Sequence, residues 1–399
     1  MIKVYTAFTK EIDDVEAAVR EILEQLNPSE NALKNTVGII HFYYEFIETG
    51  VCQAIIDALP FELAGCVSSY TATDKAYGDV SLSITMLTSD EIDFSIRVIE
   101  DVDTKTREQI TEEVKKMCIE LCEKEKPKMI MPYIPPLQQY GGDDLITTVN
   151  SLPEQVPLFG TISFNTENIN KQNYVAGGGK ISSAFAFVAL YGNVEPHFNI
   201  TTAFAFEESF GGSAKITDSE GLVLKKINDI SALRYLKEQG MITVDNQVSG
   251  GAAAVWAVPA ILTYPNGVKI VRAFLEIVEG TEYIVSTGPM ENGTEIRFAF
   301  LDGDKTLASA EQLMNDLSKS KKNGIIAYSC AARAWSLGTK YFAEAQKIAE
   351  CAKNYLSDHD NPLTYSVAYS GGEICPILDN DGKLVNALHN YTLATCSFD

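Results

Sequence analysis

Apolar residues follow two spacings along the chain, one typical of buried strands and the other typical of amphipathic helices. Unbroken apolar runs such as "GIIHFYY" and "GIIAYSC" predict strands that are covered on both faces. Apolar residues three and four positions apart predict helices, as at Tyr341, Ala345, Ile348, Ala352 and Tyr355. The alternation of the two patterns predicts an α/β protein.

The same order of elements recurs along the chain. After a strand at 2–9 and a helix at 13–26, one copy has a strand, a helix and two strands at 35–44, 46–60, 61–69 and 78–89. A second copy lies at 127–136, 141–156, 157–165 and 180–192, and a third at 323–330, 338–356, 361–372 and 386–398. In each copy the third element runs from a proline to a glycine: Pro60–Gly65, Pro157–Gly160 and Pro362–Gly372. We therefore predict mixed sheets built from repeated β-α-β-β units, with flanking helices and the three proline-led strands at their centre.

The middle of the chain interrupts this order. Residues 207–290 contain turn-forming segments such as "SFGGSAKITDSEG" and "TYPNGVK". A domain boundary fits best between about Gln239 and Gly251. The predicted organisation is a two-part composite of residues 1–245 and 246–399, which suits a chain of 399 residues.

The net charge and the lack of a targeting pattern limit the expected partners and the expected cellular location. The net charge of −22 disfavours nucleic acid and anionic membrane surfaces, because an acidic surface repels phosphate groups. The start "MIKVYTAFTKEIDD" lacks a signal-peptide pattern, and no apolar run reaches the ~20 residues of a membrane helix. A cytoplasmic location is expected.

The sequence lacks the common signatures of cofactor and metal sites. The glycines of "AGGGKISS" do not have the spacing of a phosphate-binding loop, and they predict a turn between strands. Cys118 and Cys122 are four residues apart, but no second pair completes a tetrahedral metal site. The eight cysteines are therefore predicted to be buried free thiols, and neither a cofactor nor a metal is expected.

Polar residues gather at predicted strand ends near the C-terminus. The cysteine and the arginine of "SCAARAW" follow an apolar strand, at a strand-to-helix turn where side chains reach the mouth of a cleft. The glycines of "SGGEIC" bring a glutamate to the adjacent strand end, and the histidine and asparagine of "LHNYT" open the last strand. The predicted ligand-binding residues, expected to line one pocket, are Cys330, Arg333, Gly372, Glu373, His389 and Asn390.

These residues leave more than one function open. In a binding module, Arg333 would clamp a carboxylate and Glu373 would accept an ammonium, which suits an amino acid or a similar zwitterion. In an enzyme, Cys330 would be the nucleophile and His389 its base. In a structural interpretation, Arg333 and Glu373 form a salt bridge, Cys330 lies in the core, and the chain only binds other proteins.

Three motifs in order, "IAYSCAARAWSLG", "AYSGGEICPI" and "ALHNYTLAT", resemble the C-terminal part of FIST proteins. These are the sensory modules named for F-box and intracellular signal transduction proteins. The family pattern is a cysteine, an arginine three residues on, Leu-Gly, then Gly-Glu-Ile-x-Pro and His-Asn before the closing strand. Ala332 stands where the family commonly has glycine. More loosely, "ALPFELAGCVSS", "VPLFGTISFN" and "GKISSAFAFVAL" resemble the N-terminal FIST segment, so the resemblance covers nearly the whole chain.

The resemblance implies a cytoplasmic domain that senses a small ligand, suggested for the family to be an amino acid or a similar metabolite. It favours binding over catalysis, so no catalytic residue is expected. The sequence contains no recognisable kinase, cyclase, chemotaxis or F-box segment. A role in signal transduction is therefore expected to need a separate partner protein.

Overall fold

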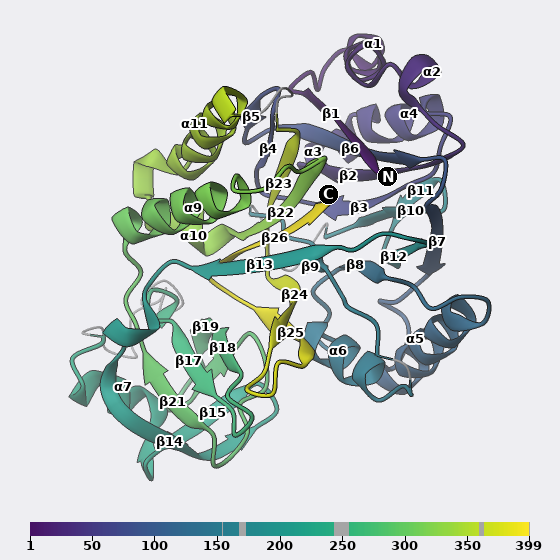
Figure 1. Cartoon of the computed structure of the whole chain (residues 1–399). Coiled ribbons are helices and arrows are strands. Elements are labelled where there is room, and N and C mark those ends of the chain that lie inside the picture. Colours follow the sequence, from purple (N-terminus) through teal and green to yellow (C-terminus); the bar gives the residue numbers. More distant parts are fainter. Residues whose placement is uncertain (154, 167–172, 243–254, 359–362, 399) are drawn as a thin grey trace.

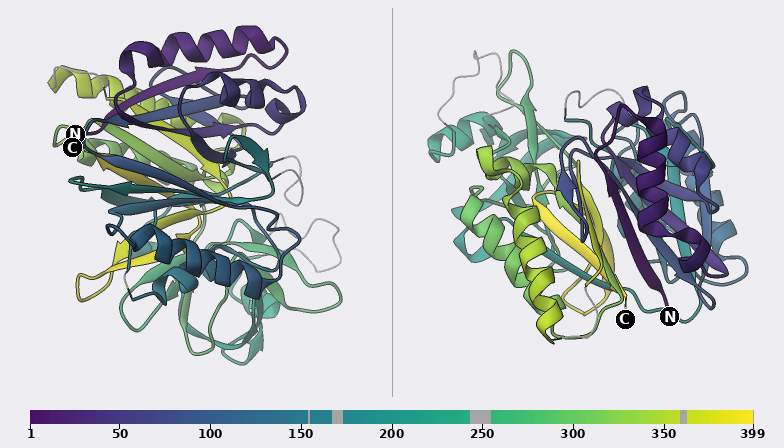
Figure 2. Two further views of the ribbon diagram at one scale, coloured as in Figure 1. Left: turned by 90° about the vertical axis from the view of Figure 1, so that its right-hand side faces the viewer. Right: turned by 90° about the horizontal axis from the view of Figure 1, so that it is seen from above.

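A computed structural model describes residues 1–153, 155–166, 173–242, 255–358 and 363–398 (Figure 1). Three six-stranded mixed sheets form the body of the molecule. An eight-stranded antiparallel sheet forms a further lobe, at the lower left of Figure 1. Helices cover the outer faces of the body, and the sheets face one another inside it (Figure 2).

The elements fall into three units and one insertion. The first unit comprises β1 Lys3–Thr9, α1 Val15–Leu26, α2 Pro28–Asn31, β2 Asn35–Phe42, α3 Glu45–Glu48, α4 Val51–Ala58, β3 Leu63–Val67, β4 Thr71–Thr73, β5 Tyr77–Gly78 and β6 Leu82–Ser89. The second comprises β7 Asp93–Ile99, α5 Arg107–Cys122, β8 Met129–Ile134, α6 Gly142–Asn150, β9 Gly160–Ile162, β10 Val175–Gly177, β11 Lys180–Ser182 and β12 Phe185–Tyr191.

The third unit is divided by the insertion. It comprises β13 His197–Thr202, α9 Gly303–Leu317, β22 Gly324–Cys330, α10 Ala331–Ser336, η2 Gly338–Lys340, α11 Ala343–Asp358, β23 Tyr365–Ser370, β24 Glu373–Leu378, β25 Leu384–His389 and β26 Thr392–Phe398. The insertion, here called the inserted domain, comprises η1 Phe206–Glu208, β14 Phe210–Glu220, β15 Val223–Ile227, β16 Ile230–Ser231, α7 Ala232–Glu238, β17 Ala260–Thr263, β18 Lys269–Arg272, β19 Phe274–Ile277, β20 Ile284–Ser286 and β21 Glu295–Phe298.

The three units build their sheets with the same topology. The strand orders are β1-β6-β2-β3-β10-β11, β7-β12-β8-β9-β24-β25 and β13-β26-β22-β23-β4-β5. In each sheet the third and fourth strands are parallel neighbours, and the fourth is the proline-led strand of the sequence repeat. The last two strands are a hairpin contributed by another unit. The predicted mixed sheets of repeated units are confirmed, and the units exchange hairpins around a ring.

An aromatic cluster lies where the three sheets meet. His41, Tyr133 and Tyr328 are buried and come from β2, β8 and β22, the third strand of each sheet. The His41 ring centroid lies 5.7 Å from that of Tyr133 and 5.6 Å from that of Tyr328. The hydroxyl oxygens of the two tyrosines are 2.9 Å apart, so one donates a hydrogen bond to the other. Equivalent positions of the repeat thus pack together at the centre.

Two glycines of the proline-led strands allow close backbone approach. A Cβ atom at Gly65 would lie 1.7 Å from the carbonyl oxygen of Ile40, and one at Gly160 would lie 2.0 Å from that of Pro132. Both glycines face the parallel partner strand in their own sheet. A side chain at either place would push the two strands apart.

Several predicted elements are interrupted at turns. The helix predicted at 46–60 is two helices, α3 and α4, because Gly50 adopts a left-handed conformation with φ 79°. The strand predicted at 386–398 is two strands joined at Tyr391, which has φ 60°. His389 therefore ends β25, and Asn390 lies in the turn before β26, so the prediction that they open the last strand is wrong.

The predicted boundary at 245/246 lies in residues 243–254, outside the described residues. It stays a prediction. Among the helices that the structure does describe, none has the length and apolar content needed to cross a membrane.

Candidate functional site

A cavity of about 460 Å³ lies where the second unit, the third unit and the inserted domain meet. Its lining residues are Arg107, Pro135, Pro136, Leu137, Gln138, Gln139, Gly141, Gly142, Asp143, Asp144, Ile162, Ser163, Phe164, Gly221, Leu222, Leu275, Ser286, Thr287, Pro289, Gly371, Leu388 and Asn390. The volume is in the range of roughly 300–1,000 Å³ that small-molecule sites occupy. We refer to it as the central cavity.

The second unit forms one wall of the central cavity at the ends of its parallel strands. Pro135 and Pro136 follow β8 directly and cannot donate the hydrogen bonds that would extend the strand. The chain turns there and enters α6, whose first residue is Gly142. The Gly141 N–H donates to Asp144 Oδ2 at 2.9 Å, which fixes the start of the helix. Ligands commonly bind at such carboxyl ends of parallel strands.

An ion pair joins the inserted domain to this wall. Arg272, on β18, is only 1% exposed and donates from Nη2 to Asp143 Oδ1 at 2.5 Å. Its Nη1 donates to the Leu388 carbonyl oxygen, on β25, at 2.8 Å. Burial raises the pKa of the Asp143 carboxyl, and the Arg272 guanidinium opposes that rise. One arginine therefore connects the inserted domain with both the second and the third unit.

Gly288 gives this ion pair the room it needs. A Cβ atom at Gly288 would lie 2.4 Å from Asp143 Oδ2 and 2.7 Å from Arg272 Nε. The neighbouring residues Thr287 and Pro289 line the central cavity. The backbone of the inserted domain thus passes directly over the Arg272–Asp143 pair.

Asn390 is the predicted site residue that lines the central cavity. Its Oδ1 accepts a hydrogen bond from the Thr287 hydroxyl at 2.6 Å, across the boundary between the third unit and the inserted domain. Gly372 lies beside it, since a Cβ atom there would be 3.4 Å from Asn390 Nδ2. Gly371, the preceding residue, also lines the cavity.

His389 faces another groove, of about 420 Å³, together with Thr392. Its Nε2 lies 3.1 Å from the carbonyl oxygen of Cys375, within hydrogen-bond distance. The side chain is 3% exposed, and burial lowers the pKa of the imidazole to about 4. At neutral pH the ring is therefore uncharged.

Arg333 is enclosed in a polar network beneath α9 and α11. Its side chain is 0% exposed, and Nε donates to Glu344 Oε1 at 2.8 Å. Nη2 donates to the Thr306 carbonyl oxygen at 3.1 Å and to the Ser309 hydroxyl at 3.0 Å. Ser329 donates to the other oxygen of Glu344 at 2.7 Å. The charge partner of Arg333 in this structure is thus Glu344, a residue that the sequence motifs do not include.

Glu373 and Cys330 lie in the same region of the core. Glu373 accepts hydrogen bonds from the hydroxyls of Thr392, at 2.7 Å, and Ser370, at 3.4 Å. Burial raises its pKa well above the usual value, and the Arg333 charge opposes part of the rise. Burial, followed by the effect of Glu373, also raises the pKa of the Cys330 thiol. A nucleophilic cysteine needs a lowered pKa, so this environment does not favour the Cys330/His389 enzyme alternative.

The side chains of the six predicted residues therefore point to different places. Asn390 lines the central cavity with Gly372 beside it, His389 lines the other groove, and Cys330, Arg333 and Glu373 are buried. Their common role in ligand binding stays a prediction.

Sequence reasoning missed Asp143 and Arg272. The signals were present: "GGDD" opens a helix after a strand, and an arginine interrupts the apolar run "KIVRAFLEIV". The same strand-end argument that selected "SCAARAW" applies equally to "GGDD".

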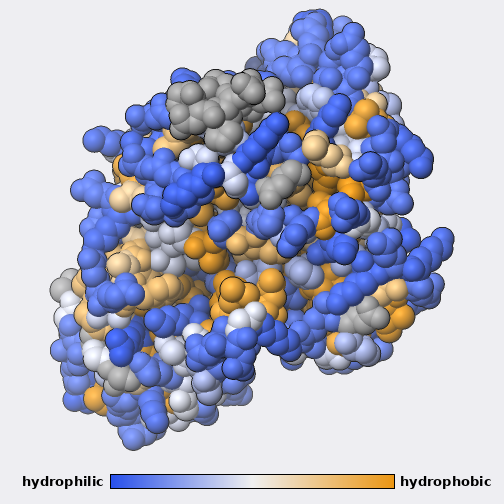
Figure 3. Space-filling view, in the orientation of Figure 1, coloured by the Kyte–Doolittle hydropathy of each residue, from blue (hydrophilic) through white to orange (hydrophobic). Residues whose placement is uncertain are grey.

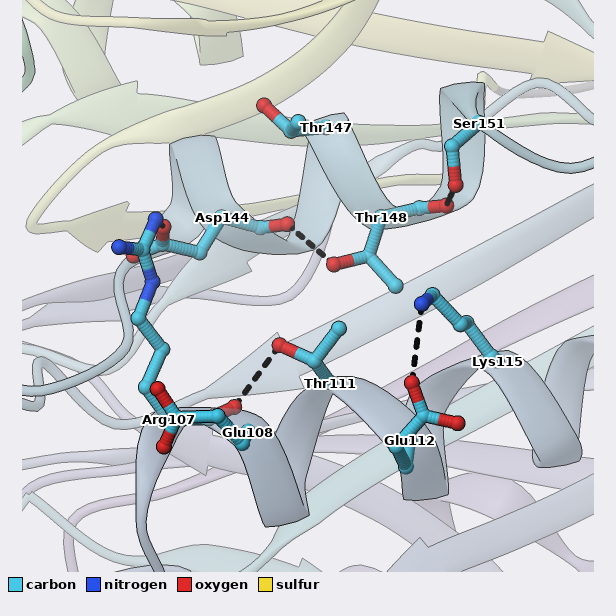
Figure 4. A pocket seen from close by; sticks show the side chains of 9 residues that line it. All are labelled: Arg107, Glu108, Thr111, Glu112, Lys115, Asp144, Thr147, Thr148 and Ser151. Atoms are coloured by element: carbon cyan, nitrogen blue, oxygen red, sulfur yellow. Dashed lines mark hydrogen bonds and ion pairs between the residues drawn. The ribbon is translucent and has the colours of Figure 1, made fainter.

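A shallower groove on the outside of the second unit is a weaker candidate (Figure 4). It lies between α5 and α6, where Arg107 pairs with Asp144 across the two helices and other polar side chains bond within their own helix. The Lys115 ammonium donates to Glu112 Oε1 at 2.9 Å, and the Thr148 hydroxyl donates to the Asp144 carbonyl oxygen at 2.7 Å. The groove is a solvated boundary between helices. Across the face drawn in Figure 3, hydrophobic side chains instead gather near the middle, where the inserted domain meets the body.

Family comparison matches two domains to this chain. The FIST N domain matches residues 37–230, and the FIST C domain matches residues 232–376. The chain therefore belongs to the FIST family, a family of sensory and signalling domains. Both matched regions contribute to the central cavity.

Other comparisons add little. No curated protein matches the chain. Among solved structures, "Structure of PurLQS from Thermotoga maritima" is 9% identical, with a TM-score of 0.20 over 100% of this chain and 72% of that one. A TM-score at this level does not indicate a shared fold.

Proposed function

We propose that this FIST protein is a sensor that binds a small ligand in the central cavity and acts in signal transduction through a partner protein. The observation that carries the proposal is the cavity itself, because its walls come from both FIST domains. A ligand there contacts two units and the inserted domain at once. Its binding free energy can therefore favour one arrangement of these parts, which is what a sensor requires.

The ligand that fits the proposal is an amino acid or a similar zwitterion. The cavity has charges of both signs, since Arg107 pairs with Asp144 at its edge and Arg272 pairs with Asp143 beneath its wall. The positive and negative charges of the two ion pairs cancel. A zwitterionic ligand, which has no net charge, therefore keeps the site neutral overall. Arg107, whose side chain is 64% exposed, would exchange its pairing with Asp144 for a ligand carboxylate, and the two aspartates suit an ammonium.

In this proposal the six residues predicted from sequence have different roles, some at the ligand and some in the surrounding core. Asn390 would contact the ligand, and Gly372 would allow the close approach of the backbone beside it. Cys330, Arg333, Glu373 and His389 would hold the strands that carry these two residues. A cytoplasmic location suits the cysteines, all of which are free thiols.

Blocking the central cavity tests the proposal. A Cβ atom at Gly141 would meet only Asp144 Oδ2, at 3.9 Å, and the residue has an ordinary φ of −102°. Gly141→Leu therefore adds a bulky side chain to the lining of the cavity at a position where its Cβ atom has room. Thr147→Leu, on the exposed side of the same helix, is the matched control.

The measurement is the melting temperature of the full chain with each of the common amino acids. An amino acid present at 100 times its Kd adds about 2.7 kcal/mol to the free energy of unfolding. The wild type and Thr147→Leu are expected to melt at higher temperature with the bound amino acid, and Gly141→Leu is not. If no amino acid changes the melting temperature, or if Gly141→Leu responds like the wild type, the proposal is wrong.

A further inference from the structure

We infer that the central cavity selects amino acids with a large apolar side chain, an inference that rests on the proposed function. Two leucines carry it. Leu222 and Leu275, both from the inserted domain, are 42% and 44% exposed, and both line the cavity. Leucines at this exposure leave apolar area in contact with water, and a ligand between them and the opposite wall would cover that area.

The second unit also contributes apolar residues to the lining. Pro136, Leu137 and Phe164 line the cavity, with the polar residues Gln138, Gln139 and Ser163 beside them. The Phe164 ring is held in place because its centroid lies 5.8 Å from that of Trp335, on α10. An apolar side chain bound in the cavity can therefore contact apolar residues of both the inserted domain and the second unit.

Several polar groups of the lining are linked in one place. Asp143 contacts Arg272, which reaches Leu388, and Asn390 bonds to Thr287. Thr287 is followed by Gly288, which packs against Asp143. These contacts place the start of α6 and the end of the β24–β25 hairpin together, so the ammonium and carboxylate of one ligand can be held there while its side chain extends along the leucines.

The size of the cavity agrees with this arrangement. A volume of about 460 Å³ accommodates an aromatic or branched side chain in addition to the amino acid backbone. Bound glycine, alanine or serine would leave the apolar residues of the lining in contact with water. Each methylene group lost from an apolar pocket lowers affinity roughly 10- to 200-fold, so the discrimination is large enough to measure.

The test is calorimetric titration of the full chain with L-phenylalanine, L-leucine, L-alanine and L-serine. We expect phenylalanine or leucine to bind at least about tenfold more tightly than alanine. Leu275→Ser should reduce that preference to about threefold or less, because it removes part of the apolar wall. Leu384→Ser is the matched control, since Leu384 is 41% exposed and does not line the cavity.

The outcomes separate this inference from the proposed function. If alanine or serine binds as tightly as leucine and Gly141→Leu abolishes that binding, the site exists and the apolar preference is wrong. A preference unchanged in Leu275→Ser also contradicts the inference. If none of the amino acids binds, the proposed function fails and the inference fails with it.

Discussion

Two buried glutamates near one arginine have different surroundings. Glu344 is bonded directly to Arg333 and accepts a further hydrogen bond from Ser329, so its charge is compensated. Glu373 accepts hydrogen bonds from Thr392 and Ser370 but has no direct ion pair among the described residues, and burial raises its pKa well above the usual value. Near Arg333 there is thus an ion pair, with Glu344, and a carboxyl group at Glu373 whose protonated form is favoured by burial.

Glutamine substitutions at the two positions should have opposite effects on stability. Glu344→Gln leaves Arg333 buried without its counter-charge, and we expect a loss of roughly 3–5 kcal/mol in the free energy of unfolding. Glu373→Gln replaces the buried carboxyl group by a neutral amide of similar shape, which removes the unfavourable burial of a charged form, and the Thr392 hydrogen bond can persist. Urea unfolding at pH 7 measures both. A large loss in Glu373→Gln with little change in Glu344→Gln would show that Arg333 is paired with the other glutamate.

The pH dependence gives the sign of the Glu373 effect. A raised pKa means that the folded chain holds a proton which the unfolded chain releases above its own pKa of about 4.5. The stabilisation from this proton is complete below that pH and is lost as pH rises towards the pKa of the folded state. Glu373→Gln should therefore gain stability over the wild type with rising pH, and the difference should disappear near pH 4.

At the scale of residues, the sequence identifies polar residues at strand ends. It does not show in which of the three units those residues face a cavity. Arg333 and Asp143 occupy similar places, each just after the third strand of a six-stranded sheet. The helices α9 and α11 cover the first, whereas the second faces the inserted domain across the cavity. That difference depends on packing between units, which no local pattern records.

At the scale of elements, two of the three parallel pairs depend on glycine. In β8 and β9 the chains approach so closely that a Cβ atom at Gly160 would lie 2.0 Å from the Pro132 carbonyl oxygen. The sequence predicts this strand and its proline-to-glycine pattern well, because the pattern is local. It predicts turns less well, since Gly50 and Tyr391 divide elements whose apolar runs are continuous.

Alanine at Gly160 should therefore disturb the sheet of the second unit. The new methyl group meets backbone, which cannot move aside as a flexible side chain can, and we expect a loss of roughly 1–3 kcal/mol or more. Gly141→Ala is the control, because its Cβ would meet nothing closer than 3.9 Å. Thermal unfolding measures both variants. Equal melting temperatures for the two would contradict the close approach of β8 and β9.

At the scale of the whole molecule, one arginine fastens the inserted domain to the body. Arg272 reaches Asp143 in the second unit and Leu388 in the third, from a strand of the inserted domain. Sequence repeats predict the three units because each copy keeps its own order of elements. The repeats do not predict which sheet each hairpin joins. The hairpin strands are only two to six residues long, and hairpins this short can pair with any free sheet edge.

Arg272→Met should loosen the inserted domain while the first unit remains intact. Methionine keeps much of the apolar stem but leaves Asp143 without a partner and the Leu388 carbonyl without its donor. We expect faster hydrogen exchange in β17, β18 and β21 and unchanged exchange in β2 and β6. Arg234→Met is a suitable control, because the Arg234 side chain is 65% exposed and pairs only locally with Glu238. Unchanged exchange in the inserted domain of Arg272→Met would contradict this role.

The ring of exchanged hairpins also determines the order in which the sheets can be completed during synthesis on the ribosome. By the time Tyr191 has been synthesised, all six strands of the first sheet exist, so that sheet can close. The second sheet then has four strands and an open edge at β9, because β24 begins only at Glu373. At ~5–20 residues per second, that edge stays open for about ten seconds or more. Unpaired strand edges can pair with other chains, so the nascent protein is most open to such pairing during synthesis of the inserted domain and α11.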